Sequence, residues 1–353
     1  MIEIKENKKV SKRIQRLREK VLSAKPSVCT ERAKFYTTVY KNNEDKPVII
    51  KRALALEKTL KEMTIFIDEG ELIVGNHSSQ LRAAPIFPEY AVDWLPEEMN
   101  DLDKRPGDAF FITEEHKKEL VEIADWWKGK VLYDKGRALM TQELRDIHDA
   151  AIIKATGNLT SGDAHIAVDF IKILETGLSG YLSEIRSYAG EVKGYSQEGI
   201  RKAQFYEALT IGIQSMSAFI KRYSDLAQNL AKQEQDPDRT KELEIIAENC
   251  NHISEKPPVN FHQALQLTFF VQLVLQIESN GHSVSLGRLD QYLYPFYKQD
   301  VLTGKITEEQ VVELLENTWI KLLSINKIRP WAHTRFSAGG PLYQNVTIVG
   351  KTA

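Results

Sequence analysis

The stretch QIESNGHSVSLGRLDQYLYPFY, residues 276–297, directly follows a long apolar run, Phe261 to Ile277, that is typical of a buried helix. Polar side chains and glycines gather in it abruptly: Glu278, Asn280, Gly281, His282, Ser283, Gly287, Arg288 and Asp290. Glycine lets backbone approach a ligand closely, and a buried polar group needs a hydrogen-bonding partner. A polar loop at the end of an apolar helix is therefore a candidate pocket wall that points inward.

The apolar run has the length of a short membrane span, but its polar residues argue against one. Glutamines recur along it at positions 263, 266, 272 and 276, which favours a core helix. The N-terminal segment MIEIKENKK has no apolar signal region, so we expect a cytoplasmic protein. With 47 Lys and Arg against 49 Asp and Glu, the net charge indicates neither a nucleic-acid nor a membrane surface.

The chain contains only two cysteines, Cys29 and Cys250, which lie far apart and in no CxxC motif. This pattern argues against a disulfide scaffold and against a zinc site.

Hydrophobic spacing predicts a mainly helical chain. At two places the spacing of apolar residues changes from that of a helix to that of a strand. Helices are expected at 10–23, 30–40, 48–62, 113–130, 141–154, 170–188, 198–233, 239–253, 261–277 and 307–324. The last of these begins with a capping box, Thr307 with Gln310. The segment TIFIDEGELIVG, residues 64–75, predicts a hairpin, and YQNVTIVGK, residues 343–351, predicts a buried strand. Because a lone strand cannot satisfy its own backbone groups, we expect the N-terminal part of a longer protein, or a truncated one.

A second polar interruption, ATGNLTSGDAHIAVDF at residues 155–170, is similar in kind to the first, and a helix is expected to restart near His165. The candidate constellation is His165 with His282 and Ser283. Its expected neighbours are Asp163, Glu278, Arg288 and Asp290. Imidazole and hydroxyl groups both donate and accept hydrogen bonds, so such a wall suits a polyol or another small polar ligand. The alternative is that His282 and Ser283 only cap the preceding helix.

Other catalytic motifs are missing from the sequence. Ser283 and Ser285 do not complete a GxSxG pattern, and neither GxxxxGK[ST] nor GxGxxG occurs. The remaining histidines, at 77, 116, 148, 252, 262 and 333, show no HExxH spacing and are expected at the surface or in the core. The residues alone therefore indicate a pocket, not a reaction.

Several segments together resemble the N-terminal part of a glycyl radical enzyme of the pyruvate formate-lyase family. They are ERAKFYT, RALALEKTL, ELIVGN, RAAPIFPEY, SGDAHIAVDF, IESNGHSVSLGRLDQYLYPFY and PLYQNVTIVG, and the resemblance covers essentially residues 1–353. It implies a mainly α chain here, an N-terminal helical layer plus the first strand of a ten-stranded α/β barrel, with the C-terminal glycyl radical domain absent. The radical glycine and the relay cysteine would lie beyond Ala353, so no catalytic role is assigned to Cys29 or Cys250.

The resemblance also indicates a branch of the family. Members that cleave pyruvate hold its carboxylate with arginines, one of them at about the position of His165. The glycerol and propanediol dehydratases have a histidine there and a His-Ser pair in the NGHS loop, and His165, His282 and Ser283 match that pattern. An imidazole does not replace the bidentate grip of arginine on a carboxylate. Ala164 departs from the glycine of many members, which leaves the particular substrate open.

The resemblance therefore implies a dehydratase or lyase that eliminates water from a polyol-like substrate, bound by His165, His282 and Ser283. A formate C-acetyltransferase and a catalytically silent truncated fragment remain alternatives. It further implies a glycyl radical installed by an S-adenosylmethionine iron-sulfur activating enzyme, anaerobic conditions and a homodimer, with no bound metal in this chain.

Overall fold

The computed structural model describes residues 10–150, 152–153, 157–162, 165–192, 196–337 and 342–348, and helices dominate these ranges. In chain order the elements are α1 (Lys12–Ser23), β1 (Ser27–Cys29), α2 (Glu31–Asn42), α3 (Val48–Glu62), β2 (Ala83–Pro85), α4 (Trp94–Glu98), η1 (Leu102–Lys104), α5 (Glu114–Trp127), α6 (Leu132–Ala138), α7 (Gln142–Asp149), α8 (Gly157–Ser161), α9 (Phe170–Gly190), α10 (Gln197–Ala231), α11 (Pro237–Ile253), α12 (Phe261–Glu278), α13 (Leu289–Leu302), α14 (Glu308–Ser324) and α15 (Trp331–Ser337). The mainly helical fold predicted from the sequence is confirmed.

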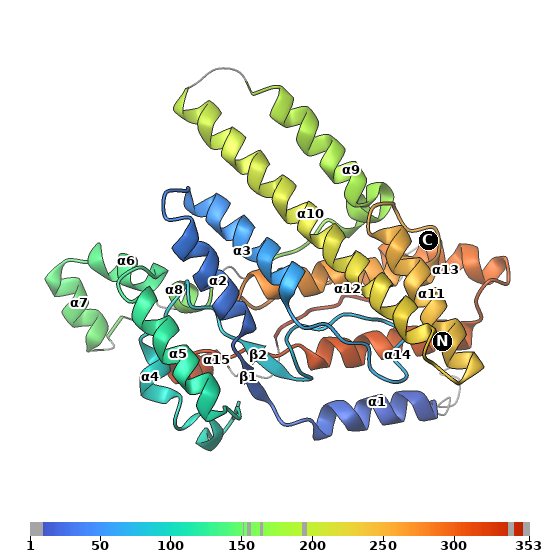
Figure 1. The fold of residues 1–353 in the computed structure, drawn as a ribbon, viewed down its shortest axis with the longest axis horizontal. Coiled ribbons are helices and arrows are strands. Elements are labelled where there is room, and N and C mark those ends of the chain that lie inside the picture. Colours follow the sequence, from blue (N-terminus) through green and yellow to red (C-terminus); the bar gives the residue numbers. More distant parts are fainter. Residues whose placement is uncertain are drawn as a thin grey trace.

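Helix α12 forms the centre of the largest hydrophobic core. It is apolar on nearly all sides and almost entirely buried, as expected for a helix that has neighbours all around it. Figure 1 shows α12 crossing the middle of the molecule, with α14 and α1 below it and the long antiparallel pair α9 and α10 projecting above. The prediction of a core helix is confirmed. Among the helices described, none combines the length and the apolarity that a membrane span requires.

The segment 64–75 is not the hairpin that its pattern predicts. The amide of Gln266 on α12 pairs with the backbone of Val74, accepting from its N–H and donating to its C=O, both at 2.8 Å. Asn317 on α14 accepts from the N–H of Ile73 at 3.1 Å. Buried side chains thus supply the hydrogen bonds that a second strand would have given, and the hairpin prediction is wrong.

A smaller core lies around two short parallel strands, β1 and β2, which pair from Ser27 with Ala83 to Cys29 with Pro85. Helices α2, α4 and α5 surround it, and the ring of Trp127 is buried there. The sequence did not predict these strands, because each is only three residues long and shows no alternating pattern.

Three element ends also differ from the sequence prediction. No helix restarts at His165; α9 begins at Phe170, as predicted for 170–188, and Asp169 caps it by accepting from the N–H of Lys172. The helix that starts after Thr141 ends at Asp149. The expected closing strand forms only one bridge within residues 342–348, between Gly287 and Val346, because the loop beside it bonds it at separate points and not as a continuous ladder. In contrast, α3 and the capping box of α14 form as predicted.

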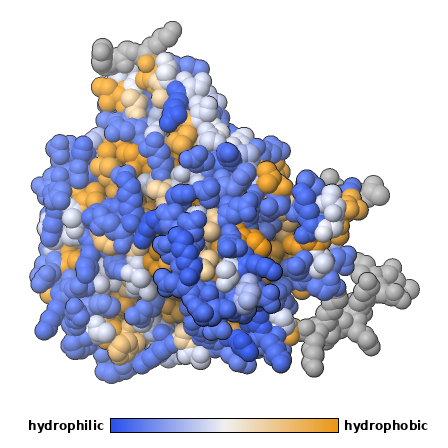
Figure 2. Space-filling model, turned by 45° about the vertical axis from the view of Figure 1, so that its right-hand side comes forward, coloured by the Kyte–Doolittle hydropathy of each residue, from blue (hydrophilic) through white to orange (hydrophobic). Residues whose placement is uncertain are grey.

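The face of the molecule seen in Figure 2 is mostly hydrophilic, and its hydrophobic side chains lie in small groups. One group lies at the top of that view, on the projecting pair α9 and α10, where Tyr188, Ile200 and Phe205 are each 47% exposed.

Candidate active site

Two loops that are far apart in the sequence run side by side at the C-terminal end of α12. The N–H of His165 donates to the C=O of His282 at 2.9 Å, and the N–H of Ser285 donates to the C=O of Ile166 at 2.9 Å. These bonds give a short parallel bridge between Ala167 and Ser285. As a result, the imidazole rings of His165 and His282 lie edge to face with centroids 5.4 Å apart.

A third segment, 342–348, completes the backbone framework. The N–H of Ser283 donates to the C=O of Leu342 at 2.8 Å, and the N–H of Thr347 donates to the C=O of Gly287 at 2.7 Å. This contact places the ring of Tyr343 5.8 Å from that of His282. The predicted strand therefore acts as a wall of the site even though it is not a regular strand.

Unusual backbone conformations gather at this junction. His165, Ser283 and Tyr343 have φ values of 59°, 64° and 50°. A positive φ costs a residue with a side chain roughly 1–3 kcal/mol, and such strain collects at functional sites where the surrounding bonds enforce it. Here the enforcing bonds are those between the three segments.

The end of α12 is held by buried cationic and imidazole side chains. The guanidinium of Arg32 donates to the C=O of Ile277 at 2.7 Å and to that of Glu278 at 3.1 Å. The Nε2 of His77 bonds the C=O of Gln276 at 3.0 Å. Positive charge is favourable at a helix C-terminus, where carbonyl groups lack helical partners. The last carbonyls of α12 are thus taken by Arg32 and His77, so His282 and Ser283 are not simple helix caps.

Two further basic residues hold the loop that follows α12. The Nζ of Lys327 donates to the C=O of Ser279 at 2.5 Å and to that of Gly281 at 2.6 Å, and Arg329 donates to the C=O of Asn280 at 2.8 Å. Both basic side chains are buried, at 1% and 4% exposed. They fix the backbone directly before His282.

The same arrangement favours the neutral form of the His282 imidazole. Burial lowers the pKa of His282 below its usual value, and the charge of Arg329 lowers it further. Burial likewise lowers the pKa of His333 to about 4, and its ring lies 6.2 Å from that of His282. The Nδ1 of His282 is buried and has no hydrogen-bond partner among the described residues. A neutral ring with an unused polar atom is ready to bond a polar ligand.

The structure brings together His165, His282 and Ser283. Glu278 pairs with Arg52, and Arg288 lies 3.6 Å from Asp290. Asp163 and Ala164 lie outside the described residues. Each of the two described carboxylates, Glu278 and Asp290, thus has an arginine as partner, and their role as neighbours of the site stays a prediction.

Sequence reasoning missed Tyr343, His333, Lys327 and Arg329 at this site. His333 was expected at the surface or in the core. The signal that could have found the basic pair is the run NKIRP after α14, which carries two cations and no acidic residue.

The cysteines do not belong to the site. Cys250 is buried in the core around α12 and Cys29 is buried in β1, and burial raises the pKa of both thiols. Neither is a candidate for radical relay. In the described ranges, no group of three or more His, Cys, Asp or Glu side chains is placed to hold a metal ion.

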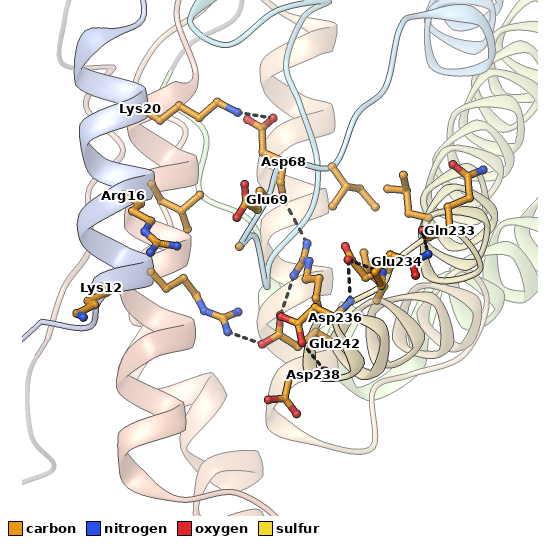
Figure 3. A pocket seen from close by; sticks show the side chains of 18 residues that line it. Lys12, Arg16, Lys20, Asp68, Glu69, Gln233, Glu234, Asp236, Asp238 and Glu242 are labelled. Carbon is orange, nitrogen blue, oxygen red and sulfur yellow. Dashed lines mark hydrogen bonds and ion pairs between the residues drawn. The ribbon is translucent and has the colours of Figure 1, made fainter.

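A hollow of about 750 Å³ lies elsewhere, between α1 and the turn that joins α10 to α11 (Figure 3). Its charged groups bond one another: Lys20 pairs with Asp68 at 2.7 Å, and Arg239 pairs with Glu242 at 2.9 Å. None of its lining residues comes from the histidine loops. Its mutually paired charges make it a poorer candidate for substrate than the junction of the loops.

Comparisons with known proteins agree on a family. The chain is 48% identical to "Probable dehydratase YbiW" of Escherichia coli (strain K12), over 93% of this chain and 40% of that protein. It is 33% identical to the (2S)-3-sulfopropanediol dehydratase of Klebsiella oxytoca, over 90% of this chain and 39% of that protein.

Solved structures give the same answer. The glycerol-bound form of the B12-independent glycerol dehydratase from Clostridium butyricum superposes with a TM-score of 0.92 at 35% identity, over 96% of this chain and 43% of that one. A structure from Roseburia inulinivorans, described by its 1,2-propanediol dehydration, superposes with a TM-score of 0.94 at 33% identity. The match covers 98% of this chain and 41% of that one.

The chain thus spans about 40% of the length of these relatives. The family model described as "Pyruvate formate lyase-like" matches residues 6–353. The chain belongs to the pyruvate formate lyase-like family.

Proposed function

We propose that this chain is the substrate-holding N-terminal part of a glycyl radical dehydratase that eliminates water from a polyol-like substrate. The observation that carries the proposal is the junction of His165, His282 and Ser283, where the two imidazole rings lie 5.4 Å apart and Ser283 directly follows His282. A carboxylate substrate such as pyruvate calls for a guanidinium at such a position. Similarity to proteins named as dehydratases of diols and of glycerol supports the same choice.

In this proposal the chain binds and orients hydroxyl groups. The unpartnered Nδ1 of His282 can accept from one substrate hydroxyl or donate to it, depending on the tautomer of the ring. The hydroxyl of Ser283 can bond a second one. Because the pKa of His282 is lowered, the neutral form of its ring is favoured, and this form can accept a hydrogen bond from a substrate hydroxyl.

The radical chemistry of the family, passed from the glycyl radical to a relay cysteine, would supply hydrogen-atom abstraction from a substrate carbon. The two cysteines present are buried away from the junction, so we propose that residues 1–353 alone hold substrate without turning it over. An activating enzyme with an iron-sulfur cluster and S-adenosylmethionine, a homodimer, a cytoplasmic location and a separate C-terminal radical domain remain part of the proposal.

The test is substrate dependence in the activated whole enzyme. Replacing His282 or Ser283 by Ala should lower kcat/KM for glycerol or propane-1,2-diol by roughly tenfold or more, since each change removes a hydrogen bond to a substrate hydroxyl. His116→Ala on α5, away from both loops, is the matched control and should leave kcat/KM unchanged. Unchanged kinetics in both site variants would contradict the assignment.

A further inference from the structure

A second hollow, of about 460 Å³, lies behind the two histidine loops. Residues of α2, α3, α5 and α6 line it together with Glu89 and Tyr90. Its volume falls within the range of small-molecule sites.

One side of this hollow is aromatic. The rings of Tyr40 and Trp127 lie 4.8 Å apart, and Trp126 stands edge-on to Trp127 at 4.9 Å. Trp126 is only partly buried, so part of its ring is accessible to a ligand. Such a wall offers stacking surface to a planar group.

The other side is cationic. The Nζ of Lys130 lies 3.8 Å from the centre of the Trp126 ring, and that of Lys51 lies 5.4 Å from the centre of the Tyr40 ring. Within the described ranges, Lys51, Lys130 and Lys135 have no ion pair. An incoming cation would be repelled by these lysines. An anion would instead draw the flexible Lys130 and Lys51 side chains from the rings toward its own charge, which exposes the ring faces to the planar part of the ligand.

The carboxylates of the hollow do not cancel this charge. Glu89 is bound by the guanidinium of Arg32, at 2.6 and 3.1 Å. Glu44 is exposed at the rim. The free lysines therefore give the hollow a surplus of positive charge.

The inner wall of the hollow contacts both loops of the candidate active site. Arg52 bonds Glu278, the last residue of α12, and donates to the hydroxyl of Tyr90 at 3.1 Å. The ring of Tyr90 packs on Gly162, where an added Cβ would lie 2.3 Å from it. Gly162 and Glu278 immediately precede the segments that carry His165 and His282.

We infer that this hollow binds a planar aromatic anion of about the size of a nucleoside monophosphate, its ring against Trp126 and its charge between Lys51 and Lys130. We further infer that its occupancy changes substrate affinity through Arg52 and Tyr90. This second statement rests on the proposed function, whereas the binding itself does not.

Binding is tested on the whole protein by calorimetry and tryptophan fluorescence with adenosine, guanosine and uridine 5′-monophosphates. At least one should saturate below about 1 mM and bind at least tenfold more tightly than its neutral nucleoside and inorganic phosphate. Lys130→Gln should weaken that binding several-fold, whereas Lys128→Gln, an exposed neighbour outside the lining, should not. Absence of saturation with all three nucleotides, or equal loss in the two variants, would overturn the site.

Coupling is tested by measuring the dissociation constant of the bound nucleotide with and without saturating glycerol. A change of about threefold or more supports it, because coupling between two sites is reciprocal. An unchanged constant, with glycerol binding demonstrated separately, overturns the coupling alone. If neither glycerol nor propane-1,2-diol nor another small polyol binds, the proposed function fails while the nucleotide site stands.

Discussion

The N–H of His165 donates to the C=O of His282 at 2.9 Å, and this bond joins the two polar loops of the chain. It holds His165 at a φ of 59°, a conformation that a free loop would rarely adopt. The imidazoles of the site are therefore oriented by backbone bonds and not by side-chain contacts alone. Changes that disturb the loop backbone should consequently affect the site even when no functional side chain is altered.

The packing of Gly162 against Tyr90 gives the first prediction. An added Cβ would lie 2.3 Å from the ring of Tyr90, at a φ of 86°. Gly162→Ala should therefore lower the free energy of unfolding by about 3–5 kcal/mol through overpacking and backbone strain. Gly287→Ala is the matched control, because its φ is 64° but no atom lies within 4 Å of the added Cβ. It should cost only about 1–2 kcal/mol. Equal losses in urea unfolding would show that Tyr90 does not confine this loop.

Ser283 allows backbone strain to be separated from function. Its φ is 64°, so Ser283→Gly should be more stable than Ser283→Ala by about 1 kcal/mol, because glycine adopts this conformation without a steric penalty. Both variants lack the hydroxyl and should lose affinity for a polyol to a similar extent. Thermal unfolding and substrate titration of the two proteins measure these quantities. A polyol affinity retained by either variant would remove Ser283 from the site.

The buried ring of His77 predicts a dependence of stability on pH. Burial lowers the pKa of His77 from the usual 6.5 to about 3. The imidazole of His77 therefore takes up a proton near pH 6.5 in the unfolded chain, but only near pH 3 in the folded chain. Above pH 6.5, the titration of His77 therefore leaves the free energy of unfolding unchanged. As the pH falls from 6.5 toward 3, that free energy decreases by up to about 1.4 kcal/mol per pH unit.

His77→Gln keeps an amide that can donate to the C=O of Gln276 but removes the titrating group. Between pH 6.5 and 5, its free energy of unfolding should fall less steeply than that of the unaltered protein. A slope remains, because burial also lowers the pKa of His262. Identical slopes in the two proteins would contradict a neutral, buried His77.

Gln266 tests whether a side-chain amide supplies the hydrogen bonds that a neighbouring strand would otherwise give to Val74. Gln266→Leu leaves the N–H and C=O of Val74 buried without partners and should cost about 3–5 kcal/mol. The exposed Gln299→Leu on α13 should change stability by less than about 0.5 kcal/mol. Urea unfolding of both variants checks the difference. A small loss of stability in Gln266→Leu would mean that water takes over the hydrogen bonds of the missing amide.

The parts of the fold that depend on local chemistry were predictable from the sequence. The all-round apolar surface of α12 and the capping box at Thr307 need no knowledge of distant residues, and both form as expected. The segments 64–75 and 343–351 carry strand patterns, but their hydrogen bonds are decided by remote groups such as Gln266 and the loop at Gly287. Such partners cannot be read from the local sequence.

The same distinction applies to the site. The polar interruptions placed His165 and His282 in loops, and the structure brings these two residues together. Their role as substrate contacts remains a prediction. Tyr343 and Lys327 were missed because their positions depend on backbone contacts with the loop after α12, and those contacts exist only once the chain has folded.

The most direct test of the central claim is product analysis of the whole enzyme after anaerobic activation. We predict that it converts a small polyol, such as glycerol or propane-1,2-diol, into an aldehyde with loss of water, and that it releases no formate from pyruvate and coenzyme A. Formate release from pyruvate, without dehydration of any polyol, would contradict the assignment of His165, His282 and Ser283 to substrate hydroxyls.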